Sequence, residues 1–218
     1  MLQLFGHPFS SYCQKALIAF YENDIPFTFR MLDPDHPDNG ARLSELWSIG
    51  KFPVLEDDGN AVFEASIIVE HLHLHHPGPV RLIPDDPAAA LEVRLLDRVF
   101  DNHVATPQQK LVLDALRPEG QKDPAGVADA RAALDQAYAW LDAHMAGREW
   151  AAGDMFSLAD CAAAPHLFYA HWSHPVPEAM RHVRAYLRRL LERPSFARAV
   201  EEARPWRPYF PLGGMPET

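Results

Sequence analysis

Near residue 77 the sequence changes from alternating strand and helix patterns to almost continuous helical spacing, and this change constrains the fold more than any other feature. Before it, short runs with the two-residue period of strands alternate with segments of helical spacing. The predicted strands are 2–5, 27–32 and a hairpin over 53–64, and the predicted helices are 11–22 and 65–75. This order, which allows a further helix between the second and third strands, predicts a small mixed sheet with a right-handed crossover between its first two strands.

Residues 77–87 are rich in proline and sustain neither pattern, so an interdomain linker is expected there. Beyond the linker, helical spacing covers almost everything. The predicted helices are 87–112, 125–146, 157–173, 178–192 and 195–203. We therefore expect an α/β domain over 1–77 and an all-α domain over 87–218. Prolines prevent residues 205–211 from being helical, and we expect this segment to pack back over the helical domain, close to any site there.

Composition narrows the class of protein. Of 218 residues, 48% are apolar and 23% are charged, which is ordinary for a globular protein. The formal net charge of -10 opposes binding to nucleic acid and to anionic membranes. The chain has no apolar run long enough for a spanning helix and no secretory pattern after Met1. Cys13 and Cys161 are too few for a disulfide scaffold, so a reduced, cytoplasmic compartment is the expectation.

The start of one helix is specified in detail. Ser157 can cap the helix while Asp160, three residues on, reaches back to the cap amide. Phe156 and Cys161 occupy the two positions of a hydrophobic staple. This pattern carries folding information and indicates no chemistry.

Chemistry is indicated where the first predicted strand gives way to the first helix, at Ser10, Ser11, Tyr12 and Cys13. A helix N-terminus presents unpaired amides and a partial positive charge, so it favours an anion. A thiolate held there has a lowered pKa. Two interpretations stay open at this point: a serine that simply caps the helix, or a serine hydroxyl that stabilises a bound anion.

Two further segments add to this signal. Pro53 stands where the third strand begins, which is typical of a sheet edge, a bend or a cis peptide bond. Glu64 precedes a second helix start at Ala65 and Ser66. An acid there can pair with the ammonium of a zwitterionic ligand, while the helix amides take its carboxylate.

Taken together, four segments resemble the cytosolic glutathione S-transferases of the serine and cysteine type. The segments are 7–13, 50–53, 63–66 and 157–160. The resemblance covers essentially the whole chain. It implies a thioredoxin-like N-terminal domain that binds glutathione and a helical domain that shapes the second-substrate site.

The resemblance also implies roles for residues of the first domain. Pro53 matches the family's cis-proline, and Phe52, next to Lys51, matches the residue whose backbone pairs with the cysteinyl part of glutathione. Glu64 matches the acid that contacts the γ-glutamyl group, and Ala65 and Ser66 belong to the same binding segment.

Ser10 falls at the position that activates the thiol, with Ser11 as the neighbouring candidate. A cysteine at position 10 would favour thiol reduction through mixed disulfides, whereas serine favours conjugation by a glutathione thiolate. The resemblance further implies a homodimer with a role in detoxification, glutathione as co-substrate and no other cofactor.

For the second-substrate site, the resemblance points to faces of two helices. The candidates are His103, His166 and Tyr169, together with Asn102, Gln108 and Trp172. Each of these residues is equally well explained as an ordinary core or surface position. The electrophile itself is not encoded in these segments.

Two rival functions remain. Ala65 stands where the family usually has a serine, which favours a binding or regulatory protein that keeps the fold without turnover. A thiol reductase working through Cys13 is the other rival, and Ser10 argues against it. Tyr12 is expected to be a packing or rim residue, and Cys161 a buried apolar one.

Histidines at 71, 73, 75 and 76 invite a metal interpretation, since His71 and His75 have the i, i+4 spacing of one helix face. Zinc usually needs three or four ligands, and no acidic or cysteine partner stands out nearby in the sequence. We therefore expect no metal site and a solvated helix end instead.

Overall fold

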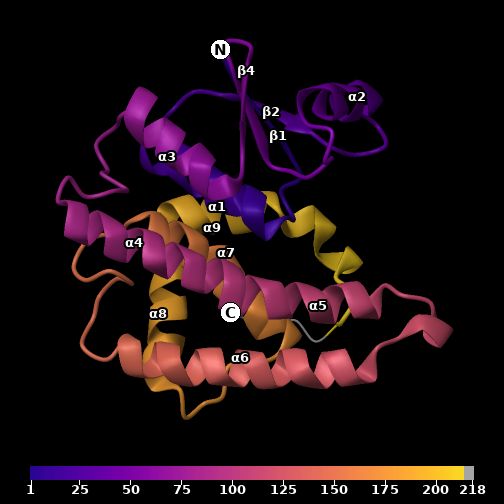
Figure 1. Ribbon diagram of the computed structural model, residues 1–218, viewed down its shortest axis with the longest axis vertical. Coiled ribbons are helices and arrows are strands. Elements are labelled where there is room, and N and C mark those ends of the chain that lie inside the picture. The colour runs from indigo at the N-terminus through magenta and orange to yellow at the C-terminus, as the bar shows by residue number, and fades with distance from the viewer. Residues whose placement is uncertain (214–218) are drawn as a thin grey trace.

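The computed structural model describes residues 1–213, and its two halves divide where the sequence changes pattern (Figure 1). The last five residues of the predicted helical domain lie outside this described part. The elements of the first half are β1 Leu2–Gly6, α1 Ser11–Glu22, β2 Thr28–Met31, α2 Pro37–Leu46, β3 Val54–Asp57, β4 Asn60–Phe63 and α3 Ala65–His75. The predicted order of strands and helices is thus confirmed.

The four strands form one mixed sheet in the order β2-β1-β3-β4. β1 runs parallel to β2 and antiparallel to β3, which in turn pairs with β4 through the hairpin. Alternate residues of β1 face opposite sides of the sheet. Leu4 belongs to the main core with α1 and α3, whereas Phe5 packs with Leu43 of α2 on the other side. α1 therefore lies between the sheet and the second half of the molecule.

Helices make up most of the described part of the second half, as predicted. Its elements are α4 Pro87–Val99, η1 Phe100–Ala105, α5 Thr106–Ala115, η2 Glu119–Gln121, α6 Pro124–His144, α7 Leu158–Ser173, α8 Arg181–Glu192, α9 Pro194–Glu202 and η3 Arg204–Tyr209. Within residues 1–213, no helix has the length and apolar character that crossing a membrane would require.

Two predictions about this half need correction. The single helix expected over 87–112 is interrupted by η1, a π-helical turn, before it continues as α5. The segment after α9 was expected to be non-helical, but η3 forms a 3₁₀-helix over Arg204–Tyr209. Pro205 stands in the first turn, where no backbone donor is needed, and Pro208 lies inside the helix. The amides of Trp206 and Phe210 bond carbonyls three residues back, at Ala203 and Arg207.

α7 is the central helix and packs against α1, α4, α5, α8 and η1. Its N-terminus has the predicted capping box, in which the Ser157 amide donates to Asp160 Oδ2 at 2.9 Å. The other Asp160 oxygen accepts from the Ala151 amide at 2.9 Å and from the Tyr186 hydroxyl at 2.5 Å. A fully buried carboxylate thus joins three segments of the helical half.

Candidate functional site

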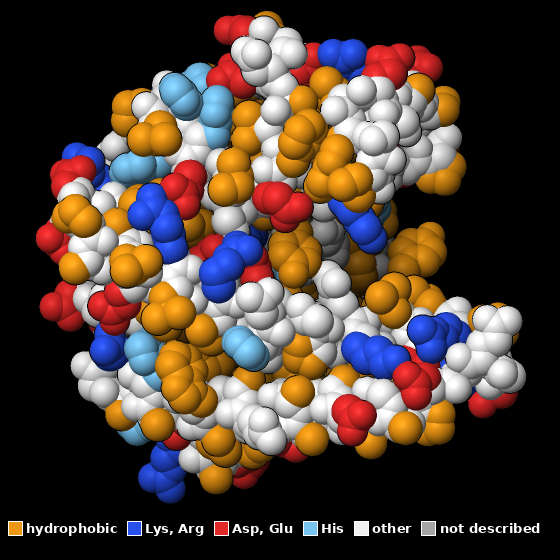
Figure 2. Space-filling view, in the orientation of Figure 1, with side chains coloured by type: hydrophobic (Ala, Val, Ile, Leu, Met, Phe, Trp, Pro, Cys, Tyr) orange, Lys and Arg blue, Asp and Glu red, His pale blue; other side chains and the backbone are white. Residues whose placement is uncertain are grey.

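A cleft of about 620 Å³ lies between the two halves. Figure 2 shows the surface hollowed on the side where α5 faces the N-terminal half. The lining from the first half is Phe9, Ser10, Ser11, Tyr12, Trp47, Lys51, Phe52, Pro53, Glu64 and Ala65. The lining from the second half is Gln108, Gln109, Val112, Leu113, Leu116, Tyr169, Tyr209, Phe210 and Pro211. The wall from the first half, called the polar wall below, contains the N-termini of α1 and α3 and several polar side chains. The wall from the second half is largely apolar.

The floor of the cleft is the N-terminus of α1. Ser10 is the N-cap, and its Oγ accepts a long hydrogen bond of 3.4 Å from the Cys13 amide. Ser11 follows at the first helical position and is nearly buried. The Ser10 hydroxyl lies beside the Cys13 thiol and lines the cleft, so it can donate its proton to a ligand there. The capping role and the anion-binding role are therefore compatible in one side chain.

Next to this floor, the Phe52–Pro53 peptide bond is cis, as predicted. Pro53 is buried, whereas Phe52 and Lys51 are exposed on the cleft wall. The Lys51 ammonium puts positive charge at the rim of the cleft, against the negative field of the whole protein.

The third part of the polar wall is the start of α3. Glu64 is exposed and has φ 67° and ψ 122°, a backbone conformation that is costly for a residue with a side chain. Ala65, the first residue of α3, lines the cleft with it. Ser66 points elsewhere: it is absent from the cleft lining, and its hydroxyl accepts from Lys15 Nζ at 2.8 Å and from Arg98. Successive helix positions differ by about 100°, which explains why Ala65 and Ser66 face different surroundings.

Two family models match the chain. One describes the glutathione S-transferase N-terminal domain and matches residues 4–80, and the other describes the C-terminal domain and matches residues 124–189. The chain belongs to the glutathione S-transferase family. Its mixed sheet with a helical second half is the glutathione S-transferase fold, which confirms the resemblance.

Several known proteins are similar to the chain over most of its length. Glutathione S-transferase GstB of Escherichia coli is 25% identical over 209 residues, which cover 92% of this chain and 98% of GstB. FtsZ-localized protein A of Caulobacter vibrioides is 31% identical over 200 residues, covering 87% and 86%. A crystal structure of a glutathione S-transferase from Methylobacillus flagellatus with glutathione bound has a TM-score of 0.81 at 25% identity, covering 91% and 98%.

Of the three residues predicted for the second-substrate site, His103, His166 and Tyr169, one lines the cleft. Tyr169 lines it, with its hydroxyl accepting from buried Gln14 at 3.0 Å. His103 is exposed within η1, and His166 is fully buried; the cleft lining includes neither. A π-helical turn takes about one extra residue, so it changes which side of the helix each position faces. Gln108, which was also considered, does line the cleft, and Gln109 beside it was missed.

Both cysteines are fully buried. Burial raises the pKa of Cys13 to about 12, despite hydrogen bonds at His7 and Ser10 that act in the opposite direction. Its thiol is therefore protonated at neutral pH, and it does not line the cleft. This geometry opposes a thiol reductase that works through Cys13. Cys161 lies in the core as predicted, and burial raises its pKa as well.

Beneath the cleft lies a buried ionic cluster that the sequence did not predict. Lys15 Nζ, on α1, contacts Asp97 at 2.5 Å and Asp101 at 2.8 Å. His166, on α7, contacts the same Asp101 carboxylate at 3.0 Å. Tyr12 connects the cluster to the cleft, since its ring packs edge-on against His166 with centroids 4.8 Å apart. The one sequence signal was Lys15, a charged residue that directly precedes the apolar run of α1.

The cluster fixes the protonation of its members. Burial tends to raise the pKa of Asp101, but His166 and Lys15 outweigh it and hold this pKa well below its ordinary value. Burial lowers the pKa of His166, which favours the neutral ring. Burial, together with the Asp101 charge, raises the pKa of Tyr12 to about 12, so Tyr12 presents a neutral phenol to the cleft.

We predict that Asp101→Asn lowers the free energy of unfolding at pH 7 by roughly 3 kcal/mol, because a buried ion pair loses one partner. The wild type should lose stability as the pH falls below about 4, because the unfolded aspartate then binds a proton that the folded one does not. The variant should lack this part of the acid dependence. Urea unfolding between pH 3 and 7 measures both effects, with exposed Asp129→Asn as the matched control. Identical pH profiles for wild type and Asp101→Asn would contradict the assigned protonation.

Proposed function

We propose that this protein is a glutathione transferase that binds glutathione against the polar wall of the cleft and attacks a small electrophile with its thiolate. The observation that carries the proposal is the Ser10 hydroxyl, which lines the cleft at the N-terminus of α1. Two similar glutathione S-transferase structures, one with glutathione bound and one with glutathione sulfonate, support the choice of ligand.

The polar wall complements the charges of glutathione, which carries two carboxylates and one ammonium. The amides at the start of α3, beginning at Ala65, can take the γ-glutamyl carboxylate, and Glu64 can pair with the ammonium beside it. The backbone of Phe52, before cis Pro53, is suited to pair with the cysteinyl unit. Lys51 supplies a cation for the remaining carboxylate. Ser66 has its hydroxyl committed to Lys15 and Arg98, so we do not include it among the direct contacts.

The sulfur then lies over the start of α1. A thiol titrates near 8.5, and lowering its pKa by about two units requires about 2.7 kcal/mol of differential stabilisation. One hydrogen bond from Ser10 to the anion and the partial charge of the helix can together supply about that much. The proton passes to solvent, and the thiolate sulfur uses its electron pair to form a bond with an electrophilic carbon. That carbon releases a leaving group or passes an electron pair to a neighbouring atom.

The opposite wall suits a small apolar electrophile. Val112, Leu113 and Leu116 of α5 line it, and Phe210 closes it after η3. This agrees with the expectation that the C-terminal segment packs back near the site. This wall also offers polar groups for orienting the second substrate, namely the side-chain amides of Gln108 and Gln109 and the hydroxyls of Tyr169 and Tyr209.

We predict that Ser10→Ala reduces thiolate formation from bound glutathione by roughly 10- to 100-fold at neutral pH, the scale of one lost donor to an anion. Ultraviolet thiolate absorbance during a glutathione titration measures the effect. Ser11→Ala is the matched control, because it removes a hydroxyl at the adjacent position while Ser10 remains.

Ser10→Ala also removes a helix cap, which costs about 1 kcal/mol, so Ser10→Thr serves as a variant that keeps both cap and hydroxyl. Thiolate signal should return in Ser10→Thr. Equal signals in Ser10→Ala and wild type, or a larger loss in Ser11→Ala, would overturn the role of Ser10.

A binding protein without turnover is the second candidate. It is favoured by Ala65, which lacks the hydroxyl usual at this family position, and by the 31% identity to a relative called FtsZ-localized protein A. Saturable glutathione binding with no thiolate signal in the wild type would select this candidate.

We also propose that the protein forms a homodimer through the outer faces of α3 and α4. Large apolar side chains are exposed there, namely Ile67, Leu74, Leu91 and Leu95. Arg94 of α4 donates two hydrogen bonds to the carboxylate of Glu70 on α3, and this bidentate ion pair holds the two helices of one chain together. An apolar surface formed by neighbouring helices is typical of a contact between identical subunits.

Replacing Leu91 and Leu95 together by Glu should convert the dimer to a monomer, because burying two unpaired charges opposes association. Sedimentation velocity measures the mass. Trp140→Glu, at another exposed apolar position on α6, should leave the dimer intact. A wild type that is monomeric at micromolar concentration would contradict the proposed dimer.

A further inference from the structure

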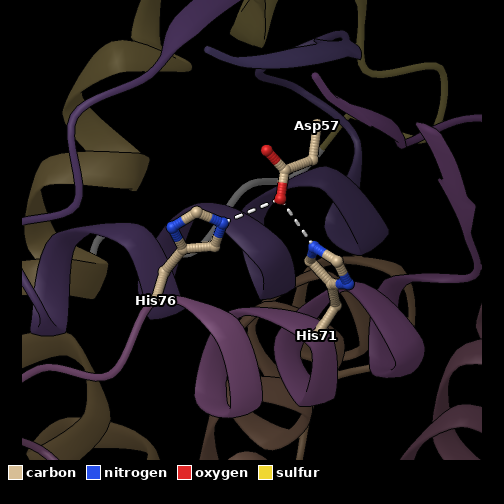
Figure 3. Close-up of side chains that lie close together, drawn as sticks. All are labelled: Asp57, His71 and His76. Atoms are coloured by element: carbon tan, nitrogen blue, oxygen red, sulfur yellow. Dashed lines mark hydrogen bonds and ion pairs between the residues drawn. The ribbon is translucent and has the colours of Figure 1, made fainter. Parts of the chain in front are cut away.

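Three potential metal ligands meet outside the cleft, where the β3–β4 turn contacts the end of α3 (Figure 3). Asp57 is the last residue of β3, His71 lies on the second turn of α3, and His76 is the C-cap of that helix. Their ligand atoms all lie within 4.8 Å of one another. The sequence offered no acidic partner for the histidines, because Asp57 is separated from them by the whole of β4 and most of α3.

Both imidazoles point at one oxygen. His71 Nε2 lies 2.9 Å and His76 Nε2 lies 2.8 Å from Asp57 Oδ2 (Figure 3). The side chains are partly buried, with exposed fractions of 17% for Asp57, 19% for His71 and 31% for His76. Three partly shielded groups that already converge need little rearrangement to surround an ion.

Two imidazole nitrogens and one carboxylate oxygen form a donor set suited to divalent transition ions, such as zinc, and less suited to calcium or magnesium. Zinc bonds of about 2.1 Å in a tetrahedron separate neighbouring ligand atoms by roughly 3.4 Å. The present contacts of 2.8 and 2.9 Å therefore need to lengthen by about half an ångström. Each ring would bind through an unprotonated Nε2 and keep its proton on Nδ1.

Room for further ligands exists on one side. Asp57 and His76 border a surface hollow of about 470 Å³, which Met1 and Asp58 also line. Water can complete the coordination from this hollow, as is typical of a site with three protein ligands.

We propose that Asp57, His71 and His76 form a binding site for one divalent transition-metal ion, with zinc as the ion of best fit. The bound ion would tie the β3–β4 turn to the C-terminal end of α3. The site is distinct from the His71–His75 pair that the helical spacing suggested. The His75 ring packs against that of His71 at a tilt of 45°, with centroids 4.5 Å apart, but His75 is not one of the three converging groups. It is also independent of the cleft, so the proposed transferase activity does not depend on it.

The test is a titration of the full chain, without an affinity tag, with zinc, in which isothermal titration calorimetry measures the affinity and the number of ions bound. We expect one ion per chain. His71→Ala, His76→Ala and Asp57→Asn should each weaken binding by about 10-fold or more, since even residues that only support metal ligands affect affinity by 10- to 100-fold. The matched controls are His73→Ala and His75→Ala on the same helix, and both should change the affinity less than 2-fold.

Circular dichroism verifies that each variant is folded, and visible absorption of Co²⁺ gives a second readout that reports ligand type directly. A Co²⁺ spectrum in the wild type that disappears in His76→Ala but persists in His75→Ala supports the proposed set. Zinc affinity that is the same in wild type and His76→Ala would overturn the proposal. So would a loss in His75→Ala as large as in His71→Ala, because the ion would then be held by the helical pair.

Discussion

The position of α1 depends on one buried interaction, the ion pairs of Lys15 with Asp97 and Asp101. Lys15 is completely buried, so its charge is tolerable only while both carboxylates surround it. Asp97 lies on α4 and Asp101 on η1, so these ion pairs connect α1 to the start of the helical half. Further contacts with Ser66 and His166 connect the same cluster to α3 and α7. The start of α1 is the floor of the cleft, and the cluster therefore fixes the floor relative to the apolar wall.

Charge at the cleft is supplied locally. The protein as a whole is acidic, with a formal net charge of -10, and would repel an anionic ligand. Two helix starts, at Ser10 and Ala65, direct backbone amides toward the cleft, and Lys51 adds one cation. Fixed backbone dipoles cost nothing to reorganise when a thiolate forms, which is why the proposed mechanism needs only one serine hydroxyl in addition.

The sequence predicted local features well. The strand and helix order, the capping box at Ser157, the cis bond before Pro53 and the position of Ser10 at a helix start each depend on residues close together in the chain. Features that depend on distant partners were missed. Lys15 and Asp101 are 86 positions apart, and no spacing rule connects them.

The sequence predicted where the helices lie more reliably than which of their side chains face the cleft. α7 is buried nearly all round, so its sequence lacks the polar stripe that would show which side faces the cleft. His166 and Tyr169 therefore seemed equivalent, although only Tyr169 lines the cleft and His166 belongs to the ionic cluster. The π-helical turn η1 similarly has no signal in the sequence, and it leaves His103 exposed while Gln108 and Gln109 reach the cleft.

The most direct test of the account is a crystal structure of the protein with glutathione. We predict that the glutathione sulfur lies about 3.3 Å from Ser10 Oγ, a hydrogen-bonding distance for sulfur, with the γ-glutamyl carboxylate at the Ala65 amide. The sulfur should face the apolar wall formed by α5. A sulfur nearer to Tyr12 or Ser11 than to Ser10, or glutathione bound outside the cleft, would contradict the account.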